Sequence, residues 1–201
     1  MSSVVISGNT SGTITLDAPN VAGTTVLTLP TANGTVLTTA NVSSNLPAGS
    51  VLQVVSTTKA DTQTITGSSY VQISGLTATI TPANSANKIL ISVSVGFSGG
   101  TNFYPAFTLY RDSTAINLNS GSGTGEECSF GFQNPTSAER YFQVNHQFLD
   151  SPSSTSSITY SVYVSPMRTS SQTININTAN TVADNNQLKG TSTITVMEIK
   201  G

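Results

Sequence analysis

Three glycine–threonine pairs at equal spacing constrain the first part of this chain more than any other feature. Gly12-Thr13, Gly23-Thr24 and Gly34-Thr35 follow one another every 11 residues, and each pair begins a short segment of threonine and aliphatic residues. A repeated extended unit of this size cannot bury its apolar side chains alone. Identical copies of the same chain are the simplest partners. The repeats therefore predict that residues 1–45 form an extended β-repeat, which acts as an oligomeric stem or as an anchor.

Composition restricts the kinds of partner that the chain can have. Only 8% of the 201 residues are charged, against roughly 25% in an average soluble protein. With a formal net charge of −2 and seven scattered basic residues, the chain has no cationic patch for nucleic acid. Its longest apolar stretch, residues 89–95, is too short to cross a bilayer. We therefore expect neither nucleic-acid binding nor membrane insertion.

The rest of the chain has the pattern of a β-sandwich. The segment 46–50, Leu-Pro-Ala-Gly-Ser, interrupts the strand pattern and predicts a joint before a head domain over residues 51–201. Apolar residues beyond the joint recur with period two, and almost nothing has the pattern of a helix. The predicted strands are Val51–Ser56, Tyr70–Ile73, Leu76–Thr81, Lys88–Phe97, Phe107–Arg111, Ala115–Leu118, Glu139–Leu149, Ile158–Ser165, Thr173–Asn177 and Thr191–Ile199. They predict an all-β fold, with an antiparallel, jelly-roll-like sandwich as the head.

Two of these strands carry candidates for an interface between subunits. The last strand is apolar on both faces, with Val196 on one and Met197 and Ile199 on the other, so it is either central in the sandwich or part of an interface. We favour the interface. His146, the only histidine, lies on an apolar strand face and is assigned to the core or to the same interface. If that face lined a three-fold axis, three copies of His146 could bind a metal ion.

Two groups of motifs resemble a known family. The stem segment Gly23–Pro30 followed by Gly34–Ala40 resembles the repeat near the start of virion fibre proteins of tailed phages, notably marine and cyanobacterial ones. The head segments Pro82–Leu90, Leu149–Pro152 and Gly190–Ile199 resemble the C-terminal head domain of the same group. The resemblance implies a trimeric structural protein of the virion with a β-sandwich head. It brings no catalytic residues and no cofactor.

The residues offer no arrangement for catalysis. With one histidine and no Gly-x-Ser-x-Gly motif, a nucleophilic triad has no support. Glu126 and Glu127 are adjacent and point to opposite faces of a strand, so they make no carboxylate pair. Cys128 has no neighbouring cation to lower its pKa, and we assign it no role. We expect no enzyme, no cofactor and no metal site.

Aromatic residues beside polar loops are the candidates for contact with a receptor, since their faces can stack on sugar rings. They are Asn102, Phe103 and Tyr104 in one loop, with Phe130 and Phe132 in another. The alternative is that these rings fill the core or a subunit interface.

Together these observations predict a homotrimeric tail fibre or spike. Its first segment would bind another virion protein, and its head would bind a host-surface glycan or protein. It would be assembled in the host cytoplasm and exposed on the particle. A fibre that decorates the capsid is an alternative within the same class. A secreted carbohydrate-binding module and a depolymerase are alternatives from other classes.

Overall fold

The computed structural model divides the chain into two compact units, Met1–Asn45 and Leu46–Gly201. It describes residues 3–7, 10–17, 23–24, 26, 31–34, 38, 42–100, 103–121, 125–133, 140–166, 172–179 and 188–201. Its elements are all strands except one short helix, and the described helix is too short to cross a membrane.

The first unit contains a two-stranded antiparallel hairpin. Its strands are β1 (Ser3–Ser7) and β2 (Thr13–Asp17), and helix α1 (Val42–Asn45) ends the unit. Gly12, which directly precedes β2, has φ = 81°, a conformation that glycine adopts without strain. The first glycine–threonine pair therefore sits where the chain turns into a strand. The apolar segments of the later repeats lie largely outside the described residues.

The hairpin does not bury its apolar side chains. Val5 and Ile6 alternate along β1, so they point to opposite faces, and both are more than half exposed. Ile14 in β2 is 66% exposed. A single two-stranded hairpin is marginally stable in water. These exposures agree with the expectation that this segment needs partners.

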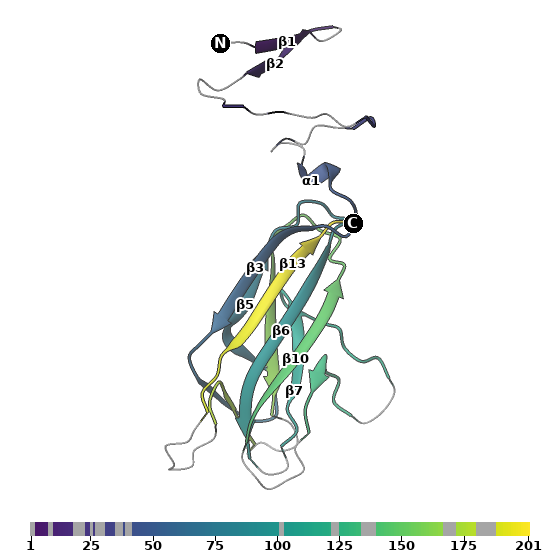
Figure 1. Ribbon diagram of the computed structural model, residues 1–201. Helices are drawn as coiled ribbons and strands as arrows, with labels where there is room; N and C mark the ends of the chain where they lie inside the picture. Colours follow the sequence, from purple (N-terminus) through teal and green to yellow (C-terminus); the bar gives the residue numbers. More distant parts are fainter. Residues whose placement is uncertain are drawn as a thin grey trace. The chain divides into compact units, whose positions relative to one another are not determined.

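The second unit is a jelly roll whose eleven described strands form two antiparallel sheets, of six and five strands. Figure 1 shows how the strands are arranged. In the first sheet the order is β3–β13–β6–β10, and β4 and β12 prolong the lines of β3 and β13. In the second sheet the order is β5–β11–β7–β8, and β9 also pairs with β7. Apart from β3–β4, β7–β8–β9 and β12–β13, which stay within one sheet, consecutive strands alternate between the sheets, as in a jelly roll. The predicted fold class is therefore confirmed.

The bounds of the head strands are as follows. The first sheet contains β3 (Val51–Lys59), β4 (Gln63–Thr66), β6 (Lys88–Gly99), β10 (Arg140–Asp150), β12 (Thr173–Ile176) and β13 (Ser192–Ile199). The second contains β5 (Val71–Ile80), β7 (Ala106–Arg111), β8 (Thr114–Ile116), β9 (Phe130–Gly131) and β11 (Ile158–Ser165).

The core lies between the sheets and follows the period-two pattern. Along β6, Ile89, Ile91, Val93, Val95 and Phe97 are at most 2% exposed. The last strand lies between β3 and β6, so it is central in its sheet.

One expected turn is a bulge. The sequence predicts two strands, Tyr70–Ile73 and Leu76–Thr81, whereas the structure has the single strand β5. Gly75 has φ = 77°, and the register with β11 shifts between Ser161 and Tyr163. A glycine in a strand interior often marks such a bulge. Ser74-Gly75 was therefore wrongly interpreted as a break.

The chain enters and leaves the head at the same end. The Gly49 amide donates to the Lys200 carbonyl, and the Lys200 amide donates to the Ser50 carbonyl, both at 2.8 Å. The segment predicted as a joint is thus hydrogen-bonded to the last residues of the head. The opposite end of the sandwich, where β6 ends and β7 and β10 begin, carries the described loop residues 103–105 and 125–133 (Figure 1).

Candidate functional site

A hollow opens at the end of the head opposite to the chain entry. It has a volume of about 460 Å³ and lies between the start of β7 and the loop on either side of β9. Its lining residues are Tyr104, Pro105, Ala106, Gly125, Glu126, Cys128, Gly131, Phe132 and Gln133. We call this the distal hollow.

Backbone hydrogen bonds fix the loop that forms one wall. The Ser129 amide donates to the Phe107 carbonyl at 2.9 Å, and the Phe132 amide donates to the Pro105 carbonyl at 3.1 Å. The Ser129 hydroxyl donates to the Ile116 carbonyl and accepts from the Leu109 amide, each at 3.0 Å. The wall is therefore held against β7 on both sides of β9.

A tyrosine holds the same loop from another strand. The Tyr70 hydroxyl donates to the Glu127 carbonyl at 2.9 Å. Burial raises the pKa of Tyr70 to about 12, so the hydroxyl keeps its proton at neutral pH. This bond ties the residues next to Glu126 and Cys128 to the region where β5 begins.

Aromatic packing fixes one side of the hollow. Phe132 is half-buried, and its ring centroid lies 4.3 Å from that of Phe142 and 5.7 Å from that of Phe97. Phe97 also contacts Phe103 and Phe107. The rings make a continuous cluster from the core to the hollow.

Besides the Tyr104 phenol, three lining side chains carry polar groups. Glu126 and Gln133 are exposed at its rim, and Cys128 is half-buried. Burial, with the nearby charge of Glu126, raises the pKa of the Cys128 thiol, which therefore stays neutral at neutral pH. Among the described lining residues, Glu126 carries the only charge.

The structure separates the predicted receptor residues. Tyr104 and Phe132 line the distal hollow. Phe103 has no exposed surface and belongs to the core, because its ring covers Gly99, and a buried ring cannot contact a receptor. Phe130 stacks between Phe107 and His146, at 5.1 and 4.7 Å. Asn102 lies outside the described residues.

The sequence pattern offers Glu126 and Cys128 no catalytic role and does not indicate that they line a common hollow. A signal for Glu126 was available, because it is one of nine acidic residues in the whole chain and stands in a glycine-rich connection between strands. In a chain so poor in charge, a charged residue at that place is a candidate for a surface contact.

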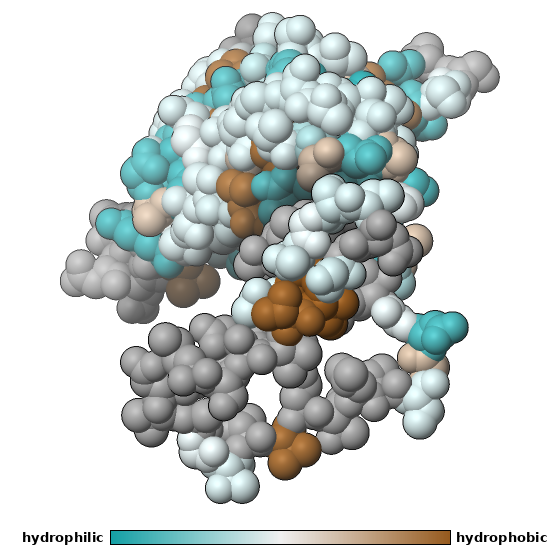
Figure 2. Space-filling model, turned by 90° about the horizontal axis from the view of Figure 1, so that it is seen from above, coloured by the Kyte–Doolittle hydropathy of each residue, from teal (hydrophilic) through white to brown (hydrophobic). Residues whose placement is uncertain are grey.

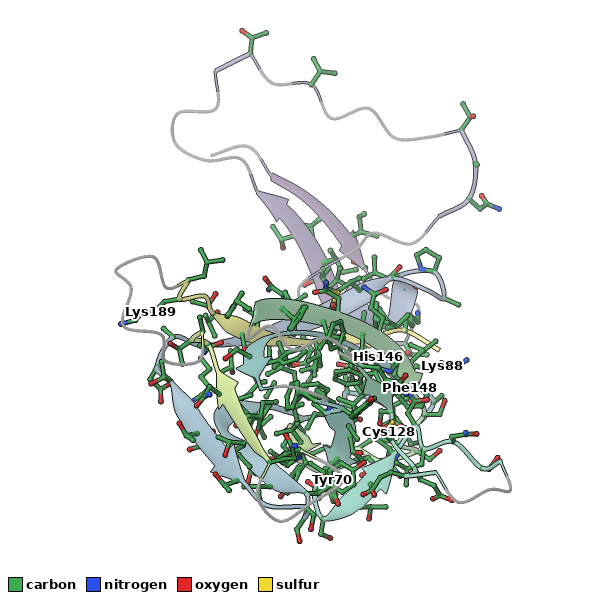
Figure 3. All side chains as sticks on the ribbon, turned by 90° about the horizontal axis from the view of Figure 1, so that it is seen from below. Tyr70, Lys88, Cys128, His146, Phe148 and Lys189 are labelled. Atoms are coloured by element: carbon green, nitrogen blue, oxygen red, sulfur yellow. The ribbon has the colours of Figure 1, made fainter. Side chains whose placement is uncertain are left out.

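His146 lies between the two sheets. It points from β10 toward the second sheet, as does Phe148, two residues further along (Figure 3). Its ring stacks on Phe130, and its Nε2 lies 2.7 Å from Asn117 Nδ2, at hydrogen-bond distance. Burial lowers the pKa of His146, which favours the neutral ring. With these partners, His146 joins the sheets of one chain; the described residues contain no cluster of three metal-ligating side chains.

A second surface lies on the outer face of the first sheet. The register aligns four apolar residues side by side across it: Val54, Met197, Leu90 and Leu149. We call them the apolar row. Val54 is 55% exposed and Leu149 is 45% exposed. Ile199 follows on the same face and pairs with Val51, which is also exposed.

Uncharged polar residues cover the face beyond the apolar row. The next two rows are Ser56, Thr195, Ser92 and Gln147, then Thr58, Thr193, Ser94 and Asn145. The Ser56 and Thr195 hydroxyls lie 2.8 Å apart. Figure 2, a view of another side of the molecule, shows the same mostly polar character, with brown apolar atoms confined to small areas.

The residues predicted for an interface fall on both sides of β13. Val196 has no exposed surface and packs in the core of a single chain, so it has none to offer a partner. Met197 and Ile199 are half-buried on the outer face. The sequence allows β13 to be central in the sandwich or part of an interface, and the structure places it centrally, between β3 and β6.

The fold defines the head as a jelly-roll domain with a hollow at one end and an apolar row on one face. No family model matches the chain, and no curated protein matches its sequence.

Two solved structures are similar at low scores. One is a chain from infectious bursal disease virus, Gt strain, with a TM-score of 0.32 and 14% identity; the match covers 98% of this chain and 50% of that one. The other is a chain of the tripod (BppUct-A-L) from the baseplate of bacteriophage Tuc2009, with a TM-score of 0.21 and 12% identity, covering 92% of this chain and 82% of that one. This chain therefore spans half the length of the first, and TM-scores this low do not establish a common fold.

Proposed function

We propose that this chain is a homotrimeric fibre or spike on a phage particle and that its head attaches the particle to a host surface. The first unit would bind another virion protein and intertwine with two sister chains. The resemblance of the stem and head motifs to phage fibre proteins supports this assignment, and so do the exposed apolar residues of the hairpin.

The proposal depends on the difference between the two ends of the head. The stem connection and the C-terminal residues meet at one end, through the bonds of Gly49 and Ser50 to Lys200. The distal hollow lies at the other end, with its loops fixed to β7. An attachment protein needs this separation, because one end must hold the particle while the other meets the host.

The apolar row supports assembly through the head as well as through the stem. Four adjacent apolar residues on a sheet face, two of them exposed, give a second copy an apolar surface to cover. The polar rows beside them contain hydroxyls and amides but no charge, so two copies could meet there without removing ions from water. Three weak sites per trimer and many trimers per particle would then raise avidity without any single tight site.

Light scattering of the full chain at micromolar concentration tests the assembly, with a mass of three chains expected. Antibody labelling of particles, viewed by electron microscopy, tests the place of the protein on the virion. Label at the tail supports a tail fibre. Label over the capsid supports the alternative, a fibre that decorates the capsid. A monomer absent from particles contradicts the proposal.

A further inference from the structure

We propose that the distal hollow binds a neutral or amino sugar of a host-surface glycan. This inference rests on the proposed function, because it names the chemical class of the receptor that the head would contact. It goes further by excluding acidic saccharides and by assigning the contact to named residues.

The hollow has the size and the mixed lining of a small-molecule site. Its volume of about 460 Å³ lies within the roughly 300–1,000 Å³ that ligand pockets usually have. The half-buried rings of Tyr104 and Phe132 supply an apolar surface, and Glu126 and Gln133 stand at the rim. Pro105 and Ala106 also line the hollow but are buried. A sugar ring has a matching construction, with C–H groups on its faces and hydroxyls around its edge. Aromatic rings pack against the faces, while carboxylates and amides bind the hydroxyls.

The charge of the hollow selects among sugars. Glu126 is the only charged residue among the described lining residues, and the Cys128 thiol is neutral. A carboxylate accepts hydrogen bonds from sugar hydroxyls and attracts a protonated amine, but it repels the carboxylate of an acidic sugar. Galactose and glucosamine therefore suit the hollow, and N-acetylneuraminic acid does not.

The hollow is formed before the ligand arrives. Its wall is bonded to β7 on both sides of β9, and Phe132 rests on Phe142 and Phe97. At Gly131 a Cβ would lie 3.3 Å from the Pro105 carbonyl oxygen and 3.7 Å from Cys128 Sγ, so glycine keeps this part of the lining open. Groups already held in place lose little entropy on binding.

The test uses the full chain and saturation-transfer NMR with three probes: galactose, glucosamine and N-acetylneuraminic acid. We expect transfer to the first two and not to the third. Gly125→Leu adds a large side chain to a lining residue at which a Cβ meets nothing within 4 Å, so we expect the variant to fold and transfer to be lost. In Glu126→Gln we expect affinity to fall about tenfold, because a hydrogen bond to a charged group becomes one to a neutral group.

Glu127→Gln is the matched control, because it removes the same charge from the next residue, which is exposed and does not line the hollow. It should bind as the wild type does. Unchanged transfer in Gly125→Leu, stronger binding of the acidic sugar, or no transfer from any probe would each overturn the inference. A trimer that sits on the virion but binds none of these sugars refutes the sugar site alone. A monomer absent from particles that still binds galactose refutes the fibre alone.

Discussion

At the scale of single residues, one buried carboxylate holds the end of the head together. Glu198 is 1% exposed, and its Oε1 accepts hydrogen bonds from the Ala83 amide at 2.7 Å and from Asn87 Nδ2 at 2.5 Å. Its Oε2 accepts from Gln53 Nε2 at 2.6 Å. It lies within segments that carry the resemblance to fibre heads, so those motifs have a structural reason: the carboxylate fixes the loop between β5 and β6 to the last strand.

We expect Glu198→Ala to lower the free energy of unfolding by about 2–4 kcal/mol, because three donors lose a charged acceptor in a buried place. Glu198→Gln keeps the shape and one acceptor oxygen and should cost less. Urea unfolding followed by circular dichroism measures both. A Glu198→Ala variant as stable as the wild type would show that water replaces the carboxylate without cost.

A second buried carboxylate joins the two sheets. Asp150 in β10 accepts from Arg111 Nη1 with both oxygens, at 3.1 and 3.0 Å, and from the Tyr160 hydroxyl at 2.7 Å. Tyr160 has no exposed surface. Burial, and then its hydrogen bond to Asp150, raise the pKa of Tyr160 above its usual value near 10.

This raised pKa makes stability fall at alkaline pH. Above about pH 10 an unfolded tyrosine loses its proton while folded Tyr160 keeps it, so the unfolded state binds fewer protons and the free energy of unfolding decreases as pH rises. Tyr70, with a pKa of about 12, acts in the same direction. We expect Tyr160→Phe to lose roughly 1.5–3 kcal/mol at pH 7 and to show a shallower decrease between pH 10 and 12. Equal slopes in urea titrations at those pH values would contradict the role of Tyr160.

At the scale of elements, β6 organises the head. It pairs with β10 along nearly its whole length, and on its other side with β13 and then β12. Phe97, near its end, contacts four other rings, those of Phe103, Phe107, Phe132 and Phe142. Phe97 therefore contacts both the core rings and Phe132, which lines the distal hollow.

Phe97→Ala should destabilise the head by about 3–5 kcal/mol, the cost of a large cavity in a packed core. Phe142→Ala, at a half-buried ring of the same cluster, should cost less. Midpoints of urea unfolding at constant slope give the comparison. If the two variants are equally stable, the cluster is not centred on Phe97.

The sequence predicts strands well where apolar residues of a buried face alternate with polar residues of an exposed face. Ile158–Ser165 agrees with β11 at both ends, and Lys88–Phe97 falls two residues short of β6. The sequence does not predict strand β4, Gln63–Thr66, because only Ile65 among its residues is apolar. One apolar residue shows no alternation of apolar and polar positions. The sequence leaves Phe103 open between receptor contact and the core for a related reason, since an aromatic residue in a loop sequence has the same pattern whether its ring is buried or exposed. The distal hollow forms where loops from separate parts of the chain meet, and a local sequence pattern cannot predict such contacts.

At the scale of the whole molecule, the apolar row makes a prediction about assembly. The double variant Val54→Asp with Leu149→Asp should fold, because both positions are exposed in one chain. It should lower the fraction of trimer at micromolar concentration, since burying a carboxylate at a contact costs several kcal/mol. Light scattering measures the mass, and a thermal melt checks the fold.

Val71→Asp is the control, because Val71 is an exposed valine of the other sheet, in β5. This variant should stay trimeric. If it dissociates while the double variant does not, the contact between copies lies on the second sheet.

The hydrogen bonds between residues 49–50 and Lys200 have a further consequence for how such heads can be exchanged. A domain whose two ends are neighbours can be spliced as a unit into a foreign carrier without stretching either junction. We therefore expect residues 46–201 to fold when they are transplanted onto an unrelated trimeric shaft. Under the proposed function, transfer of this segment alone would transfer the choice of host.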